Sequence, residues 1–67
     1  MTNNEAFKAL FDELKITQVK FAARHEIIPQ TVHKWLKNKL NISNKTLEKI
    51  AKKEGYKVTF NIKIEKI

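Results

Sequence analysis

The sequence predicts a single, mainly α-helical domain, in which residues 1–55 form four helices and residues 56–65 form one β-strand. Three observations support this fold class. Four segments space their apolar residues as helices do, the C-terminal segment alternates apolar and polar residues, and a single glycine leaves little room for flexible joints. A chain of 67 residues is near the lower limit for unaided folding, and without cysteine it lacks disulfides and thiolate metal sites. We therefore expect oligomerisation to contribute to stability.

The first two helices each follow a threonine. Thr2 and Glu5 fit a capping box, and the segment behind them repeats apolar residues at i, i+3, i+4 and i+7, at Phe7, Leu10, Phe11 and Leu14. This pattern predicts a helix over about residues 3–15. Thr17 is expected to cap a second helix that ends near His25. The small and apolar contacts of that helix are expected from Val19, Phe21, Ala22 and Ala23.

A third helix is predicted over about residues 29–37. Pro29 suits its first turn, because proline already has a helical φ and its missing N–H would have no partner within the helix. Val32, Trp35 and Leu36 form the apolar face. We interpret Trp35 as a core residue and not as a platform for base stacking.

A fourth helix is predicted after Ser43 or Asn44, either of which can cap it. Its buried stripe is expected at Leu47, Ile50 and Ala51. Gly55 stands where a left-handed residue would end the helix.

The C-terminal segment is predicted to be one strand because its apolar residues fall at every second position, at Tyr56, Val58, Phe60, Ile62 and Ile64. No other segment has this alternation, so the strand would lack a partner within the chain. We therefore expect it to pair antiparallel with the same strand of a second copy, with those five residues at the dimer interface. The alternative interpretation is a frayed tail whose alternation is accidental.

Positive charge is concentrated in the second half of the chain. The net charge is +7, yet in residues 1–33 the four cationic side chains are balanced by four acids. Residues 34–45 contain no acid at all. A basic patch of this kind attracts polyanions, so nucleic acid is the leading partner class. The alternative interpretation is an ordinary lysine-rich, solvated surface.

Other classes of protein find little support in the sequence. No apolar run approaches the length of a membrane span and "MTNNEAF" lacks the features of a signal peptide, so we expect a cytoplasmic, nucleoid-associated protein with no membrane partner. An enzyme is not expected, because no nucleophile-and-base arrangement and no glycine-rich phosphate loop is present. His25 and His33 are eight residues apart with no cysteine, so no metal or cofactor is expected.

Residues 17–36, "TQVKFAARHEIIPQTVHKWL", resemble the helix-turn-helix of Cro/CI-like repressors, the Xre family. The residues that carry the resemblance are Gln18, Phe21, Ala22, Ile27, Val32 and Trp35. The resemblance extends through "TLEKIAKKEGY" in the helix that usually follows, so that it covers about 55 of the 67 residues. Two positions depart from the family pattern: Glu26 replaces the usual turn glycine, and Ile28 replaces the usual Ser or Thr cap.

The resemblance implies a lambda-repressor-like fold whose third helix enters the major groove of double-stranded DNA. It also implies a dimer-forming C-terminal strand and a function as a phage or bacterial transcriptional repressor. Such a dimer would bind an inverted-repeat operator.

Four residues of the third helix are the candidates for base reading. Gln30 can pair with adenine N6 and N7, and Lys34 with guanine O6 or N7, or with a phosphate. Thr31 is a weaker candidate for a thymine methyl or a phosphate, and His33 for the groove edge. The alternative is that Gln30 and Thr31 are simply solvated residues of a first turn.

Contacts with the DNA backbone are expected from five residues. By resemblance, Gln18 would hold a phosphate at the N-terminus of the second helix. The others follow the third helix in the chain and are Lys37, Asn38, Lys39 and Lys45.

A second hypothesis belongs to another class of function. The chain would then be a protein-interaction module, an antitoxin or phage-encoded component whose strand from Tyr56 to Ile64 augments the sheet of a partner. RNA is a less favoured partner, because no exposed aromatic pair or RNA-binding signature is present.

Overall fold

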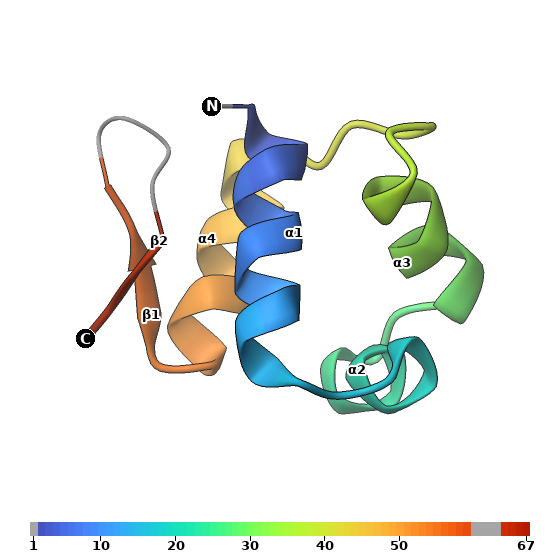
Figure 1. Ribbon diagram of the computed structural model, residues 1–67, viewed down its shortest axis with the longest axis horizontal. Helices are drawn as coiled ribbons and strands as arrows, with labels where there is room; N and C mark the ends of the chain where they lie inside the picture. The colour runs from blue at the N-terminus through green and yellow to red at the C-terminus, as the bar shows by residue number, and fades with distance from the viewer. Residues whose placement is uncertain (1, 60–63) are drawn as a thin grey trace.

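Helix α1 is the centre of the arrangement, with α3 on one side and α4 and a β-hairpin on the other (Figure 1). The computed structural model describes residues 2–59 and 64–67. Its elements are α1 (Asn3–Leu14), α2 (Gln18–His25), α3 (Pro29–Leu36), α4 (Asn44–Lys53), β1 (Tyr56–Val58) and β2 (Ile64–Lys66). The four predicted helices are confirmed, each within about one residue of its expected bounds.

Side-chain hydroxyls start three of the four helices. The Thr2 hydroxyl accepts from the Glu5 N–H at 3.1 Å while the Glu5 carboxylate accepts from the Thr2 N–H at 2.9 Å, which is the predicted capping box. The Thr2 backbone N–H, followed by its hydroxyl, holds the pKa of the Glu5 carboxyl below its ordinary value. Thr17 and Ser43 cap α2 and α4 in the same way, so Ser43 and not Asn44 is the cap residue.

The core forms where the apolar stripes of the four helices meet. Phe7 of α1 is fully buried and contacts both Phe21 of α2 and Trp35 of α3 in T-shaped geometry, with ring centroids 5.4 Å and 5.2 Å apart. Edge-to-face pairs of this kind add to the free energy of burying the rings. Trp35 is thus a core residue, as predicted.

The predicted inward position of Val19 is wrong, because 66% of this residue is exposed. Phe21 and Ala22 occupy the inner face of α2. With 3.6 residues per turn, Val19 and Ala23 then lie on the outer face, where the structure finds both exposed.

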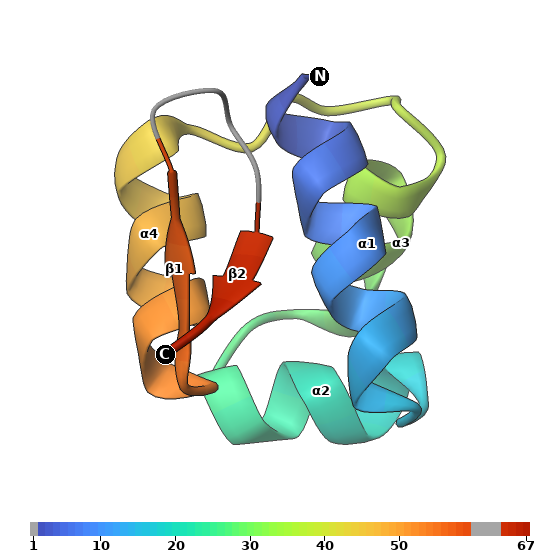
Figure 2. The same cartoon turned by 60° about the vertical axis from the view of Figure 1, so that its left-hand side comes forward.

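The C-terminal segment differs from the single strand that its alternation predicted. Strands β1 and β2 pair with each other antiparallel, in the register Tyr56↔Lys66, Lys57↔Glu65 and Val58↔Ile64. The hairpin covers α4 and also reaches α1 (Figure 2). Because two paired strands satisfy each other's backbone groups, the partner strand expected from a second copy is supplied by the chain itself.

Three of the five predicted interface residues are half-buried within the chain, where Tyr56, Val58 and Ile64 pack against the helical core. The alternation therefore marks a face that packs on the protein's own helices. Phe60 and Ile62, the other two, lie outside the described residues. Within the described residues, no helix combines the length and the apolar character needed to cross a bilayer.

Candidate nucleic-acid interface

Helix α3 presents one side to the core and the other to solvent. Val32 and Trp35, three residues apart, are the buried residues of this helix. On the opposite side Gln30, His33 and Lys34 are exposed. Three of the four predicted base-reading residues therefore share an accessible helix face, since residues three and four apart are neighbours on a helix surface. Thr31, the fourth, is half-buried.

A tight turn joins α2 to α3. Glu26 adopts the left-handed conformation, with φ 55° and ψ 44°, a region of φ that glycine enters without steric cost. The Ile27 N–H donates to the Ala22 carbonyl at 2.8 Å and the Glu26 N–H to the Ala23 carbonyl at 3.3 Å. These two bonds form a Schellman motif, which closes α2 and sets the path of the chain into α3.

The N-terminus of α3 lacks the side-chain cap found at the other helices. Ile28 occupies the cap position with φ −70° and ψ 130°, and no side-chain hydrogen bond is made there. A Ser, Thr, Asp or Asn at such a position stabilises a helix by about 0.5–2 kcal/mol relative to an apolar residue. Ile28 is also 67% exposed, so the core does not account for its apolar side chain.

The C-terminus of α3 ends in a second Schellman motif. Asn38 takes the left-handed conformation at φ 59°, which asparagine tolerates better than most residues. The Asn38 N–H donates to the Trp35 carbonyl at 3.3 Å and the Lys39 N–H to the Lys34 carbonyl at 2.9 Å. Lys37, Asn38 and Lys39 are all exposed at this end of α3, as backbone contacts require.

A buried asparagine, which the sequence analysis missed, holds this C-terminal end of α3. Asn4 of α1 is 5% exposed. Its Nδ2 donates to the Trp35 carbonyl at 3.1 Å and to the Leu40 carbonyl at 2.8 Å, and its Oδ1 accepts from the Ile42 N–H at 3.0 Å. One amide thereby joins the first helix to both ends of the segment that follows α3. The sequence contained one indication that Asn4 is buried, because Asn4 lies three residues before Phe7 and therefore falls on the apolar stripe of α1.

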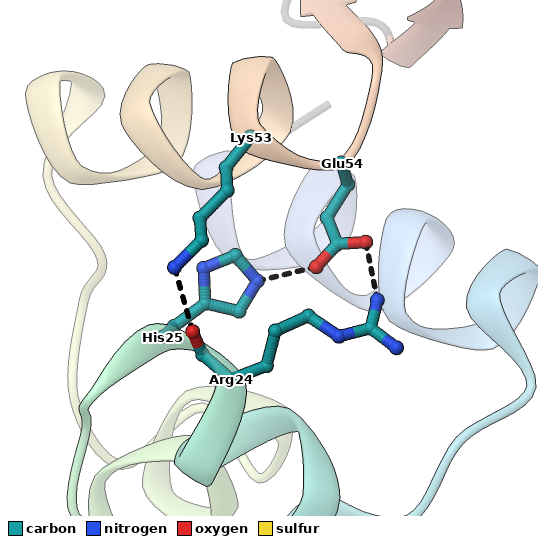
Figure 3. Close-up of polar contacts among 4 residues, drawn as sticks. All are labelled: Arg24, His25, Lys53 and Glu54. Atoms are coloured by element: carbon teal, nitrogen blue, oxygen red, sulfur yellow. Dashed lines mark hydrogen bonds and ion pairs between the residues drawn. The ribbon is translucent and has the colours of Figure 1, made fainter.

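A polar cluster, also not anticipated, ties the end of α2 to the end of α4 (Figure 3). The Glu54 carboxylate contacts the Arg24 guanidinium and His25 Nε2, each at 2.6 Å. The side chains of Glu54 and His25 are only 6% and 4% exposed, whereas Arg24 is 46% exposed. Lys53 Nζ also donates to the Arg24 carbonyl at 2.6 Å. The cluster fixes α2, and with it the turn into α3, against α4.

Two remaining candidates come from other helices. Gln18 is the first residue of α2 and is half-buried. Lys45 is exposed, but it belongs to the first turn of α4, which lies across α1 from α3 (Figure 1).

The positive charge of the second half is spread over α3, α4 and the hairpin, whose exposed lysines in the described residues are Lys57 and Lys66. Lys34, Lys37 and Lys39 lie on α3 and in the segment directly after it. A separate hollow lies between the turn and α4, with His25, Ile27, Thr46, Lys49, Ile50 and Lys53 among its lining residues. The acid-free run at residues 34–45, which was predicted to form one basic patch, therefore places only three lysines at the α3 surface. Other lysines lie on α4, away from this surface.

Among the described residues, no group of three His, Asp or Glu side chains is placed to hold a metal ion. Comparison with known proteins finds no matching family model, and no match among curated proteins or among solved structures.

Proposed function

We propose that the protein is a sequence-specific, double-stranded DNA-binding transcriptional regulator of the Cro/CI-like kind. The observation that carries the proposal is the two-sided character of α3: Val32 and Trp35 attach it to the core, while Gln30, His33 and Lys34 remain free on its outer face. The B-DNA major groove is wide enough to admit one α-helix. In this proposal α2, the turn at Glu26 and α3 act as a lambda-repressor-like helix-turn-helix, and α3 is the recognition helix.

The outer face of α3 offers the chemistry for direct reading of bases. The Gln30 amide can donate to adenine N7 and accept from N6, and Lys34, one turn later, can donate to guanine O6 or N7. His33 lies beside Gln30 on the same exposed face and would contact the edge of the groove. Thr31 contributes less in this proposal, because it is half-buried.

Backbone contacts are assigned to the two ends of this unit. Lys37 and Lys39 are exposed at the C-terminal end of α3, where they would neutralise phosphates. Asn38 keeps the chain in its left-handed turn there and offers its amide to a phosphate. Gln18, at the capped N-terminus of α2, would donate to a phosphate with help from the helix dipole. Lys45 is the weakest of the five candidates for a backbone contact, because it lies in the first turn of α4 and not near α3.

Binding as a homodimer is part of the proposal. The apolar face of the hairpin already packs on the helices through Tyr56, Val58 and Ile64. A second copy would therefore pair at an outer edge of the two-stranded sheet, because each strand has a neighbouring strand on one side only. A two-fold dimer would bind an inverted repeat whose half-sites lie about 34 Å apart, one turn of DNA.

Selection of bound sequences from a random duplex pool tests the proposal, with sedimentation of the free protein alongside. We expect an inverted repeat and a dimer. Within the selected site, Gln30→Ala should relax the preference at one base pair, whereas Lys37→Ala should weaken binding to all sequences and reduce the salt slope by about one. Protection of an isolated half-site by a monomer, or the absence of any enriched sequence, would contradict the proposal.

One observation favours the second candidate function, a module that augments a partner's sheet. The hairpin of the described residues has only two strands, so its outer edges are available to a strand of another protein. If this is the primary function, Val58→Pro should abolish capture of the partner while Gln30→Ala and Lys37→Ala leave it unchanged.

A further inference from the structure

Ile28 combines two features that oppose stability. It exposes 67% of its surface, although isoleucine is among the residues most often buried. It also replaces a capping residue at the start of α3, while the other three helices are capped by Thr2, Thr17 and Ser43. The chain thus places an exposed apolar side chain at the start of the proposed recognition helix.

The backbone holds this side chain in a fixed position. The Ile28 carbonyl accepts from the Thr31 N–H at 2.9 Å, which begins the helix, and Pro29 restricts the next φ. On the other side, the Ile27 N–H is bonded to the Ala22 carbonyl at 2.8 Å. Because Ile28 is held between two bonded segments, its contact with a ligand costs little backbone entropy.

The first turn of α3 is uncharged. Ile28 and Pro29 are exposed and apolar, Gln30 is exposed and polar, and the first cation of the helix is Lys34. In the major groove the C5 methyl of thymine is the one apolar group that a base edge presents. An exposed aliphatic side chain at the groove end of a recognition helix is complementary to that methyl group.

We propose that Ile28 reads the C5 methyl group of a thymine in each half-site. The inference rests on the proposed function and deepens it, because it names what the N-terminal turn of α3 recognises. Gln30 on adenine and Ile28 on a thymine methyl together make this turn a reader of A·T pairs, while the Lys34 end takes guanine or phosphate.

Replacing single thymines of the selected duplex with deoxyuridine tests this inference, because deoxyuridine lacks only the methyl group. We expect wild-type protein to lose about three- to fourfold in affinity at one thymine of each half-site, as burial of one methyl predicts. Ile28→Ser should bind the thymine and deoxyuridine duplexes at that position equally well. The same variant should melt at a higher temperature than wild type, since serine can cap α3.

Two further variants serve as controls. Ile67→Ser removes another exposed isoleucine, 77% exposed, from the end of the hairpin and should keep the full response to deoxyuridine. Ile28→Val keeps an apolar contact and should show an intermediate response. The inference is overturned if no thymine position responds to deoxyuridine, or if Ile28→Ser keeps the wild-type loss. Failure of the proposed function is a different result, because then no duplex would be enriched from the pool at all.

Discussion

Removal of the buried Asn4 amide should strongly destabilise the protein. Asn4→Ala deletes three hydrogen bonds and leaves the buried Ile42 N–H without its side-chain partner, whereas the Trp35 carbonyl still accepts from the Asn38 N–H. The unsatisfied Ile42 N–H costs about 1–3 kcal/mol, and the Trp35 and Leu40 carbonyls each lose one hydrogen bond worth about 0.5–1.5 kcal/mol. The expected loss is therefore about 3 kcal/mol in the free energy of unfolding. For a chain of 67 residues, whose stability is expected to be about 3–10 kcal/mol, this is a large fraction.

Urea unfolding followed by tryptophan fluorescence measures this loss directly. Trp35 is the only tryptophan of the chain, and its carbonyl is one of the three partners of Asn4. Circular dichroism on the same samples would show whether helix content falls in the same transition. Coincident transitions are required before a free energy is calculated.

The neighbouring asparagine provides a matched control. Asn3 Nδ2 donates to the part-buried Ile42 carbonyl and to the Asn44 side chain, while Asn3 Oδ1 is buried without a hydrogen-bond partner. Asn3→Ala removes that unpaired oxygen together with two weaker bonds, so its expected cost is less than about 1 kcal/mol. If Asn4→Ala and Asn3→Ala lower the stability equally, the reasoning from buried hydrogen bonds is refuted.

Three further predictions concern the turn, the polar cluster and the first cap. Glu26→Gly should raise the free energy of unfolding by up to about 1 kcal/mol, because glycine adopts the left-handed region without strain. Gly55→Ala should lower it by about 1 kcal/mol, because alanine is strained at φ 83° even though its Cβ would meet no other atom within 4 Å. Thermal melting of both variants checks these opposite signs. Glu54→Ala should lower the stability by about 1–3 kcal/mol in urea unfolding because it leaves the buried His25 Nε2 without its hydrogen-bond partner, and a loss no larger than that of Arg24→Ala would contradict this reasoning. The lowered pKa of Glu5 contributes stability that is complete above its ordinary value of 4.5 and is lost as pH falls through the folded-state pKa. Glu5→Gln should therefore differ most from wild type in stability above pH 4.5, and the two proteins should converge on acidification. If the carboxylate were irrelevant, unfolding measured across that pH range would show a constant difference.

Local features of the sequence were sufficient to predict the helices. Thr2, Thr17 and Ser43 act on N–H groups within the next three residues, and the left-handed Gly55 ends α4, so these signals need no tertiary partner. The outer face of α3 followed from the same reasoning, because the burial of Val32 and Trp35 determines which side chains remain exposed. Val19 shows the limit of such reasoning, since two faces of the short α2 carry small or apolar residues and packing chose between them.

The supports of the candidate site could not be predicted in this way because their partners are distant in the chain. Asn4 bonds to residues that follow it by 31 to 38 positions, and Glu54 bonds to residues about 30 positions before it. A polar residue's sequence neighbours do not indicate whether it will be solvated or buried against such a partner. Only the packing of α1 and α4 against the other helices places these groups together.

The sequence by itself determined the helix boundaries, the core role of Trp35 and the polar outer face of α3, since each depends on periodicity or on hydrogen bonds within a few residues. The tertiary structure alone decided that Tyr56, Val58 and Ile64 pack within a hairpin, that Asn4 and Glu54 hold the C-terminal ends of α3 and α2, and that the lysines divide among α3, α4 and the hairpin. The physical reason is that alternation reports a half-buried face but not what covers it, and charge composition reports the sum of the lysines but not the direction in which each one points.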